Sequence, residues 1–153
     1  MKSTRMVKGK SMKIIRSKEE LEGSCYIEVL PGKYFGECWS EKSIFFTEEV
    51  FGFIEKSIDN EFPEYDHYAF NKIGRETWFK ILDRLDMLIN FIDEDVTIDQ
   101  LKMNVYFIFA DTEQEFQQDF NNNILKVREI AKEFQIWIKE QLETYEYISV
   151  LGI

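Results

Sequence analysis

An apolar stripe between residues 78 and 92 constrains the fold of this chain more than any other feature of its sequence. Its members recur at spacings of three and four, which place them on one face of an α-helix. They are Trp78, Ile81, Leu82, Leu85, Leu88, Ile89 and Ile92. Polar residues such as Lys80 and Asp83 fall on the opposite face. The pattern predicts an amphipathic helix whose apolar face must be covered by a second layer of structure.

Two further segments carry a helical pattern. Thr47 is a good N-cap residue, and the four-residue repeat after it predicts a helix that runs to about Phe62, where a proline follows. Apolar residues from 116 to 138 keep helical spacing behind a capping residue, Asp111, and this predicts one long C-terminal helix. The asparagine run 121–123 has low helix propensity, so a bend is expected there.

Runs rich in β-branched and aromatic residues predict the strands. They cover residues 13–16, 25–30, 33–39, 43–46, 103–109 and 147–151. Pro31 and Gly32 occupy the central positions of a type II turn, which predicts a hairpin between the second and third of these runs. Residues 64–72 are expected to form a loop. Short strands intermixed with helices indicate an α+β fold, with a small, mainly antiparallel sheet packed against about three helices, including the long C-terminal one.

Length and charge indicate one folded unit behind a basic lead-in. A chain of 153 residues fits one domain. We expect residues 12–153 to form that domain and residues 1–11 to be a flexible basic segment. The first 18 residues hold seven of the 19 basic side chains and no acidic one, which leaves 12 basic against 29 acidic side chains in the rest of the chain.

This acidic body narrows the choice of partners. Nucleic-acid binding draws on Lys and Arg side chains that neutralise phosphates, so direct binding of DNA or RNA is not expected. A basic protein partner is expected, because opposite charges raise the rate of encounter. The alternative is that the acidity serves only solubility.

The sequence carries no signature of secretion or of membrane insertion. No apolar segment of signal-peptide length follows the N-terminal basic residues, and no stretch approaches the roughly 20 apolar residues that span a bilayer. A cytoplasmic location is therefore expected, where Cys25 and Cys38 stay reduced. Both cysteines are expected to behave as small, half-buried apolar side chains.

Motifs for catalysis and cofactor binding are missing. The chain has no glycine-rich phosphate loop, no nucleophile elbow and no EF-hand pattern. Its one histidine, His67, rules out a histidine-rich metal site and is expected to be a surface loop residue. A pair of His67 with Cys38 or Cys25 is formally available, but nothing in the spacing indicates it. We therefore expect a protein that is not an enzyme and that needs no metal or cofactor.

Two segments combine aromatic and acidic side chains in a way that suits protein binding. In the loop 61–68 the expected contact residues are Glu61, Glu64, Tyr65, Asp66 and Tyr68. In the segment 37–41 they are Glu37, Trp39 and Glu41. Tyrosine and tryptophan are enriched at the energetic centres of interfaces, and carboxylates pair with Arg or Lys. The alternative is that these aromatic side chains cover the ends of helices or belong to the core.

Three segments carry a resemblance to a known class of proteins. They are Tyr34-Phe35-Gly36-Glu37-Cys38-Trp39 ahead of the helix that begins near Thr47, the pattern Trp78-x-x-Ile81-Leu82-x-x-Leu85, and the terminal Ile148-Ser149-Val150-Leu151-Gly152-Ile153. On these segments the chain resembles the small acidic immunity proteins of bacterial polymorphic-toxin systems, such as contact-dependent growth inhibition. The resemblance implies a cytoplasmic antidote that binds a cognate toxin domain, often a nuclease, and blocks its active site or substrate surface.

That function agrees with the charge, since a nuclease is basic around its substrate cleft and an acidic inhibitor offers the complementary field. An immunity protein is therefore the leading hypothesis. The first alternative is a non-enzymatic regulatory or scaffold domain that binds another protein. The second is an enzyme that uses Cys38 or a pair of carboxylates.

Overall fold

The computed structural model describes residues 12–93 and 95–153, so the expected basic lead-in at residues 1–11 lies outside the described part. The elements follow one another in the order η1 (Lys18–Glu20), β1 (Tyr26–Pro31), β2 (Ile44–Thr47), α1 (Glu48–Asp59), β3 (Phe70–Gly74), α2 (Arg75–Phe91), α3 (Ile98–Lys102), α4 (Ala110–Gln118), α5 (Phe120–Leu142) and β4 (Tyr147–Leu151). Here η1 is a single turn of 3₁₀-helix. The expected α+β fold, with a small antiparallel sheet and a long C-terminal helix, is confirmed.

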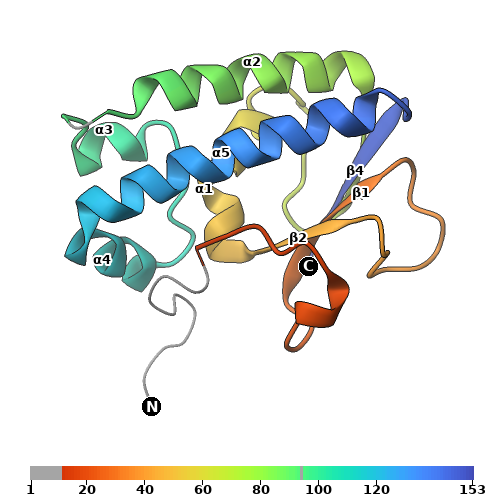
Figure 1. The fold of residues 1–153 in the computed structure, drawn as a ribbon, viewed down its shortest axis with the longest axis horizontal. Coiled ribbons are helices and arrows are strands. Elements are labelled where there is room, and N and C mark those ends of the chain that lie inside the picture. The colour runs from red at the N-terminus through yellow and green to blue at the C-terminus, as the bar shows by residue number, and fades with distance from the viewer. Residues whose placement is uncertain (1–11, 94) are drawn as a thin grey trace.

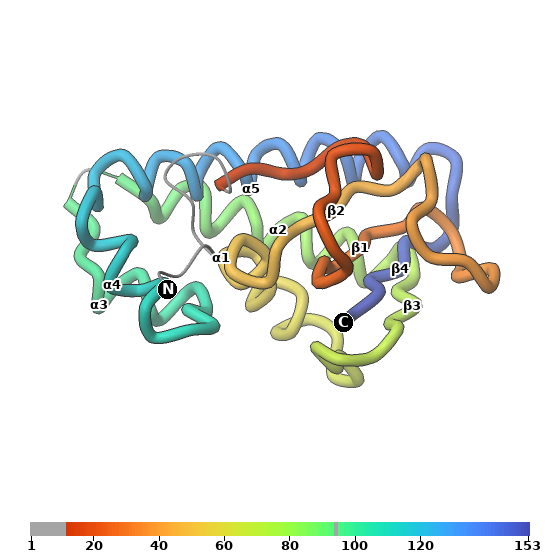
Figure 2. The backbone as a smooth tube through the Cα atoms, turned by 90° about the horizontal axis from the view of Figure 1, so that it is seen from below, coloured from red at the N-terminus to blue at the C-terminus, as the bar shows by residue number. Residues whose placement is uncertain are grey.

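The two longest helices, α2 and α5, run antiparallel and side by side along the molecule (Figures 1 and 2). The sheet lies under one end of this pair, and α3 and α4 lie at the other end, with α1 between them. The chain therefore returns from the helices to the sheet twice, from α1 into β3 and from α5 into β4.

The sheet has the strand order β2-β1-β4-β3, and every neighbouring pair is antiparallel. Side chains alternate between its two faces. One face carries Ile27, Val29, Ile44, Phe46, Ile73, Ile148 and Val150, which all join the main hydrophobic core with the helices. The other face carries Glu28, Leu30, Phe45, Phe70, Lys72, Tyr147, Ser149 and Leu151, none of which belongs to that core. We call this second side the helix-free face.

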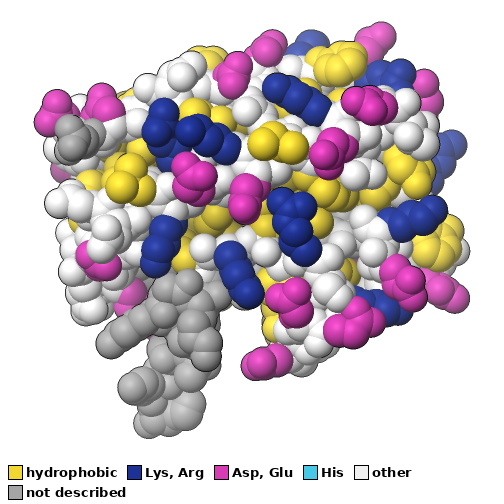
Figure 3. Space-filling view, in the orientation of Figure 1, with side chains coloured by type: hydrophobic (Ala, Val, Ile, Leu, Met, Phe, Trp, Pro, Cys, Tyr) yellow, Lys and Arg dark blue, Asp and Glu magenta, His cyan; other side chains and the backbone are white. Residues whose placement is uncertain are grey.

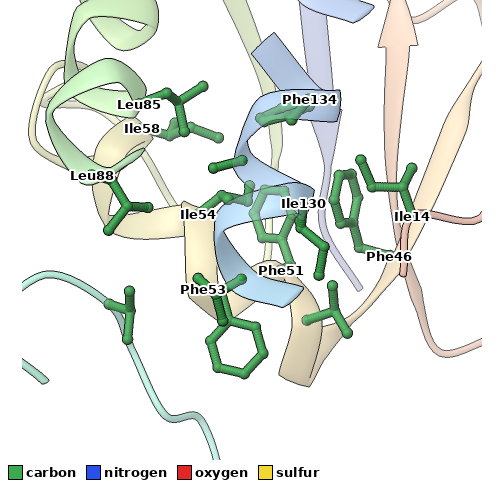
Figure 4. Close-up of a cluster of buried hydrophobic side chains, with 14 of the residues drawn as sticks. Ile14, Phe46, Phe51, Phe53, Ile54, Ile58, Leu85, Leu88, Ile130 and Phe134 are labelled. Carbon is green, nitrogen blue, oxygen red and sulfur yellow. The ribbon is translucent and has the colours of Figure 1, made fainter. Parts of the chain in front are cut away.

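Aromatic side chains fill the space between the sheet and the helices. Phe46 of β2 meets Phe51 of α1 and Phe134 of α5, with ring centroids 5.2 and 5.4 Å apart (Figure 4). Trp78 of α2 is fully buried, and its Nε1 donates to the carbonyl oxygens of Ile73 and Ile148 at 3.1 Å each. This bond ties the predicted apolar stripe to both strands at the β3 edge of the sheet.

Helix boundaries differ from the predicted ones by a few residues. Thr47 caps α1 as expected, since its hydroxyl accepts from the Val50 amide at 3.3 Å, but α1 ends at Asp59. The long C-terminal helix α5 begins at Phe120, later than predicted, because the backbone breaks at Asp119 (φ −140°, ψ 53°), just ahead of the asparagine run, and the residues before the break form the separate helix α4. Asp111 lies within the first turn of α4 and does not cap it; Phe109 is the N-cap residue.

The predicted hairpin at the start of the chain is wrong. After β1 the backbone turns away at Gly32, whose φ of +84° is a conformation that glycine adopts without strain. Residues 33–39 form no strand, and β1 instead pairs with β2 and β4. Residues 13–16 contribute one isolated bridge, Ile15 to Phe45, and residues 70–72, expected in a loop, belong to β3.

The predicted buried strand at residues 103–109 is also wrong. The segment follows α3 as turns and coil, and its backbone runs close along α1. The Tyr106 amide donates to the carbonyl of Gly52 at 2.9 Å, and the Lys56 ammonium donates to the carbonyl of Met103 at 2.7 Å. A segment rich in β-forming residues thus hydrogen-bonds to helix α1 in place of a neighbouring strand, and Gly52 of that helix leaves room for its backbone.

Gly52→Ala tests this close approach. Helix propensity alone favours alanine inside a helix by about 1 kcal/mol. The added Cβ would, however, lie 2.6 Å from the Tyr106 carbonyl oxygen, which is backbone and cannot swing aside. We expect urea unfolding to show a net loss of about 1–3 kcal/mol, in the range of overpacked sites. Gly74→Ala, where the nearest atom is 3.8 Å away, is the control, and a stabilised Gly52→Ala protein would contradict the packing.

Candidate functional site

The residues expected to contact a partner lie on two loops. The β1–β2 loop, residues 32–43, carries Glu37, Trp39 and Glu41. The α1–β3 loop, residues 60–69, carries Glu61, Glu64, Tyr65, Asp66 and Tyr68. They join the sheet at opposite ends: the β1–β2 loop follows Pro31, which pairs with Ile148, and the α1–β3 loop precedes Phe70, which pairs with Leu151 near the C-terminus (Figure 2). The β1–β2 loop folds back over the sheet, and the ring of its Tyr34 packs edge to face on that of Phe70, the first residue of β3, 4.7 Å apart between centroids.

A buried carboxylate holds the β1–β2 loop in place. Glu28 of β1 is 1% exposed and accepts three hydrogen bonds from the loop. They come from the amides of Trp39 and Ser40, at 2.8 and 3.0 Å, and from the hydroxyl of Ser43 at 2.6 Å. Trp39, with a φ of +65°, packs its ring against Phe45. The helix-free face of the sheet therefore fixes the loop, through charge-assisted hydrogen bonds to Glu28 and the contact of Trp39 with Phe45.

A second buried carboxylate holds the α1–β3 loop. Glu55 of α1 is 2% exposed and accepts from the Tyr65 hydroxyl at 2.5 Å. The same carboxylate bonds Nδ1 of His67, while Nε2 of His67 lies 2.8 Å from a carboxylate oxygen of Glu48. His67, expected on the surface, thus bridges two acidic side chains of one helix, and its side chain is only 17% exposed.

Protonation of His67 is favoured by this arrangement. Partial burial of the ring opposes a charge, but the hydrogen bonds to Glu48 and Glu55 outweigh it and raise the pKa of His67 above its usual value. A doubly protonated ring donates from both nitrogens, one to each carboxylate. Burial and the neighbouring Glu55 raise the pKa of Tyr65, which keeps its hydroxyl a donor.

A cysteine–histidine pair does not form. Both ring nitrogens of His67 bond carboxylates, and both cysteines are free thiols. Desolvation and the nearby Glu28 carboxylate raise the pKa of Cys38, which disfavours the reactive thiolate. The expectation of half-buried cysteines is wrong: Cys25 precedes β1 and Cys38 lies in a loop, so both are exposed.

The α1–β3 loop has a third support from the sheet. The Asn71 side chain, 5% exposed, accepts from the Asp66 amide at 3.0 Å and donates to the Asp66 carbonyl at 2.9 Å. The Gly152 amide donates to the Ala69 carbonyl at 2.9 Å. A Cβ on Gly152 would lie 2.2 Å from the His67 carbonyl oxygen, so a glycine is needed where the C-terminal segment passes this loop.

The aromatic side chains that face solvent are mostly not the expected ones. Trp39 and Tyr65 are half-buried and hold their loops, which agrees with the structural alternative for them. The exposed aromatic residues of the two loops and of the first position of β3 are Tyr34, Phe35, Tyr68 and Phe70, at 40%, 62%, 71% and 48% exposure, and the rings of Tyr34 and Phe70 are in contact. We call these four the aromatic surface. Only Tyr68 is among the predicted contact residues, because Tyr34 and Phe35 fall in the predicted strand 33–39 and Phe70 in the predicted loop 64–72, outside the segment 61–68.

The acidic side chains of the two loops differ in whether they form ion pairs. Glu61 is paired with Arg84 at 2.5 Å, and Glu41 with Lys18 at 3.8 Å. Glu37 and Glu64 are exposed, and exposed Asp66 also accepts from the Tyr68 amide at 2.9 Å. On the face crossed by α5, acidic and basic side chains are interspersed, so the acidity of the chain is not gathered there (Figure 3).

Comparison with known proteins adds no assignment to this site. No protein-family model matches the chain, and no curated protein or solved structure matches it at a significant level. Within residues 12–93 and 95–153, no group of three or more His, Cys, Asp or Glu side chains is placed to hold a metal ion. In the same part of the chain, no helix is both long and apolar enough to cross a bilayer.

The bridge formed by His67 predicts a pH dependence of stability. A histidine whose pKa is raised on folding stabilises the fold below its unfolded pKa of about 6.5, and that contribution is lost as the pH rises through the folded pKa. We expect wild type to exceed His67→Gln in free energy of unfolding at pH 5.5 and the difference to shrink by pH 8.5, measured by urea denaturation. A difference that grows with pH would show that the ring is held neutral.

Glu28→Gln tests the anchor of the β1–β2 loop. The amide nitrogen would face donors that the carboxylate accepted, and a buried donor without an acceptor costs about 1–3 kcal/mol. We expect that loss of stability together with faster hydrogen exchange at the amides of Trp39 and Ser40. Exposed Glu22→Gln serves as the control. Unchanged exchange at both amides would mean that the loop is held by other contacts.

Proposed function

We propose that this protein is a cytoplasmic immunity protein that binds a cognate toxin domain and blocks its active site or substrate surface. The observation that supports this most is the aromatic surface: Tyr34, Phe35 and Tyr68 lie on two loops that the buried carboxylates Glu28 and Glu55 hold, and Phe70 lies at the start of β3. Loops fixed before binding lose less conformational entropy when a partner docks. Exposed tyrosine and phenylalanine side chains supply the contact area that dominates many interfaces.

The charges around the aromatic surface suit a basic partner. Glu37 and Glu64 are exposed and make no ion pair within the described residues, so a partner can reach them without breaking one. Their attraction acts chiefly on the rate of encounter and is screened by salt. Inhibition by obstruction needs no catalytic group of its own. A regulatory or scaffold domain would use the same surface on another partner, and a toxicity assay separates the two.

If the proposal holds, a toxin domain is encoded directly upstream of this gene, and the test is neutralisation of that domain. Co-expression of wild type is expected to restore growth. Tyr68→Ala is expected to weaken binding of the purified domain about tenfold, because truncation of an interface centre costs more than about 1 kcal/mol. Phe79→Ala removes an aromatic side chain of 51% exposure from α2 and is the control.

Glu64→Lys tests the electrostatic part of the same proposal. Glu64 is exposed and its side chain makes no bond within the described residues, so the change leaves the loop intact; Asp66→Lys would also remove the bond to the Tyr68 amide. We expect slower association with an unchanged thermal transition. Growth rescue and binding equal to wild type in both Tyr68→Ala and Glu64→Lys would remove this surface from the interface.

A further inference from the structure

The helix-free face of the sheet is covered unevenly. Over β1 and β2 it is covered by the β1–β2 loop, through Glu28 and the contact of Trp39 with Phe45, and by the bridge from Ile15. Beyond that loop, towards β3, a hollow of about 210 Å³ remains. It lies between the first residues of the loop and the exposed side chains of β3, Phe70 and Lys72.

The hollow combines apolar walls with two cations. Tyr34, Phe70 and Leu151 supply the walls. Ser149 also lines it, but its hydroxyl already donates to the Gly32 carbonyl at 2.8 Å. Asn71 lines it as well, but its side-chain amide is bonded to the backbone of Asp66. The charged residues of the lining are Lys33 and Lys72.

Both lysines are held against one aromatic ring. The ammonium of Lys33 lies 4.9 Å from the ring centre of Tyr147, and that of Lys72 lies 5.1 Å from the same centre. Neither makes an ion pair with a described residue, although acidic side chains outnumber basic ones in this chain. Tyr147 is not among the residues that line the hollow, so each ammonium turns from this ring to meet an anion there; because neither lysine is paired with a carboxylate of the described residues, that anion gains an ion pair with both.

The kind of anion follows from the surroundings. The body of the chain is acidic, and Glu37 lies on the loop that borders the hollow, so a polyanion such as a nucleic acid is repelled. A single carboxylate on an otherwise neutral or basic surface meets much less repulsion. The apolar walls favour a carboxylate that comes with a neighbouring apolar side chain, and the volume admits about one side chain.

We propose that this hollow is an anchor pocket for a protein partner, and that it takes an Asp or Glu side chain flanked by an apolar residue in a segment of that partner. The pocket adjoins the aromatic surface through Tyr34 and Phe70. This proposal rests on the proposed function, because the partner it assumes is the same toxin domain. One acidic residue in a basic surface would then fix the register in which that domain docks.

The experiment uses the full chain and short peptides, so it needs no toxin. Acetyl-Gly-Asp-Phe-Gly-amide is titrated into ¹⁵N-labelled protein, beside matched peptides with Asn or Lys in place of Asp. We expect shifts at the amides of Lys33, Tyr34, Phe70, Lys72 and Leu151, and up to about 25-fold tighter binding of the Asp peptide, since each of two exposed ion pairs is worth up to roughly fivefold. Equal binding of the Asp and Asn peptides, or no shift at these amides, overturns the proposal.

Paired variants identify the groups that recognise the carboxylate. In the double variant Lys33→Gln with Lys72→Gln, the preference for Asp over Asn is expected to fall to about one. Lys80→Gln with Lys139→Gln removes two exposed cations from α2 and α5 and is expected to keep it. Loss of the preference in both double variants would show that the net charge of the protein, and not these two lysines, causes the preference for Asp, and it would overturn the proposed pocket.

A further probe separates a peptide site from a small-molecule site. If 3-phenylpropionate shifts the same amides while the Asp peptide does not, the hollow takes a free acid and the proposal fails. The proposed function has its own test in Tyr68→Ala and Glu64→Lys, neither of which lines the hollow. A failed peptide titration therefore contradicts the pocket but not the proposed function. A failed neutralisation assay contradicts the proposed function, and peptide binding to the pocket can still be measured.

Discussion

A carboxylate that is removed from water must find hydrogen-bond donors, and the two buried carboxylates Glu28 and Glu55 find theirs in loops. Glu28 draws backbone amides and a hydroxyl from the β1–β2 loop, and Glu55 draws a phenol and an imidazole from the α1–β3 loop. Each bond would be weak in water and is stronger in a site shielded from it. The surface that a partner would meet is thus shaped by charges that the partner never touches.

The sheet explains why the loops lie where they do. Its core face packs on α1, α2 and α5, and Trp78 bonds two strands from above. Among residues 12–93 and 95–153 the helix-free face has no such layer; a loop covers part of it, and a hollow lies at the β3 side. Antiparallel sheets tolerate one face towards water, and binding residues gather on loops that a rigid scaffold positions. The aromatic surface and the hollow are both consequences of this asymmetry.

Several residues show why the site was harder to predict than the fold. Trp39 and Tyr65 look like interface anchors from composition, but each turns inward to hold its loop. Tyr34 and Phe35 look like strand residues, because nothing local says that Glu28 will bind the amides of Trp39 and Ser40 in place of a strand partner. His67 has unremarkable neighbours in the chain, and its carboxylate partners are 12 and 19 residues away.

The sequence by itself determined the fold class, the amphipathic helix that became α2, the cap at Thr47 and the closing strand β4. These depend on periodicity and on capping within a few residues, which neighbours in the chain decide. Only the tertiary structure decided that residues 103–109 lie on Gly52, that β1 pairs with β4, and that Tyr34 meets Phe70. Each of these joins segments distant in the chain, and their geometry depends on how the helices and the sheet pack together, which no local pattern encodes.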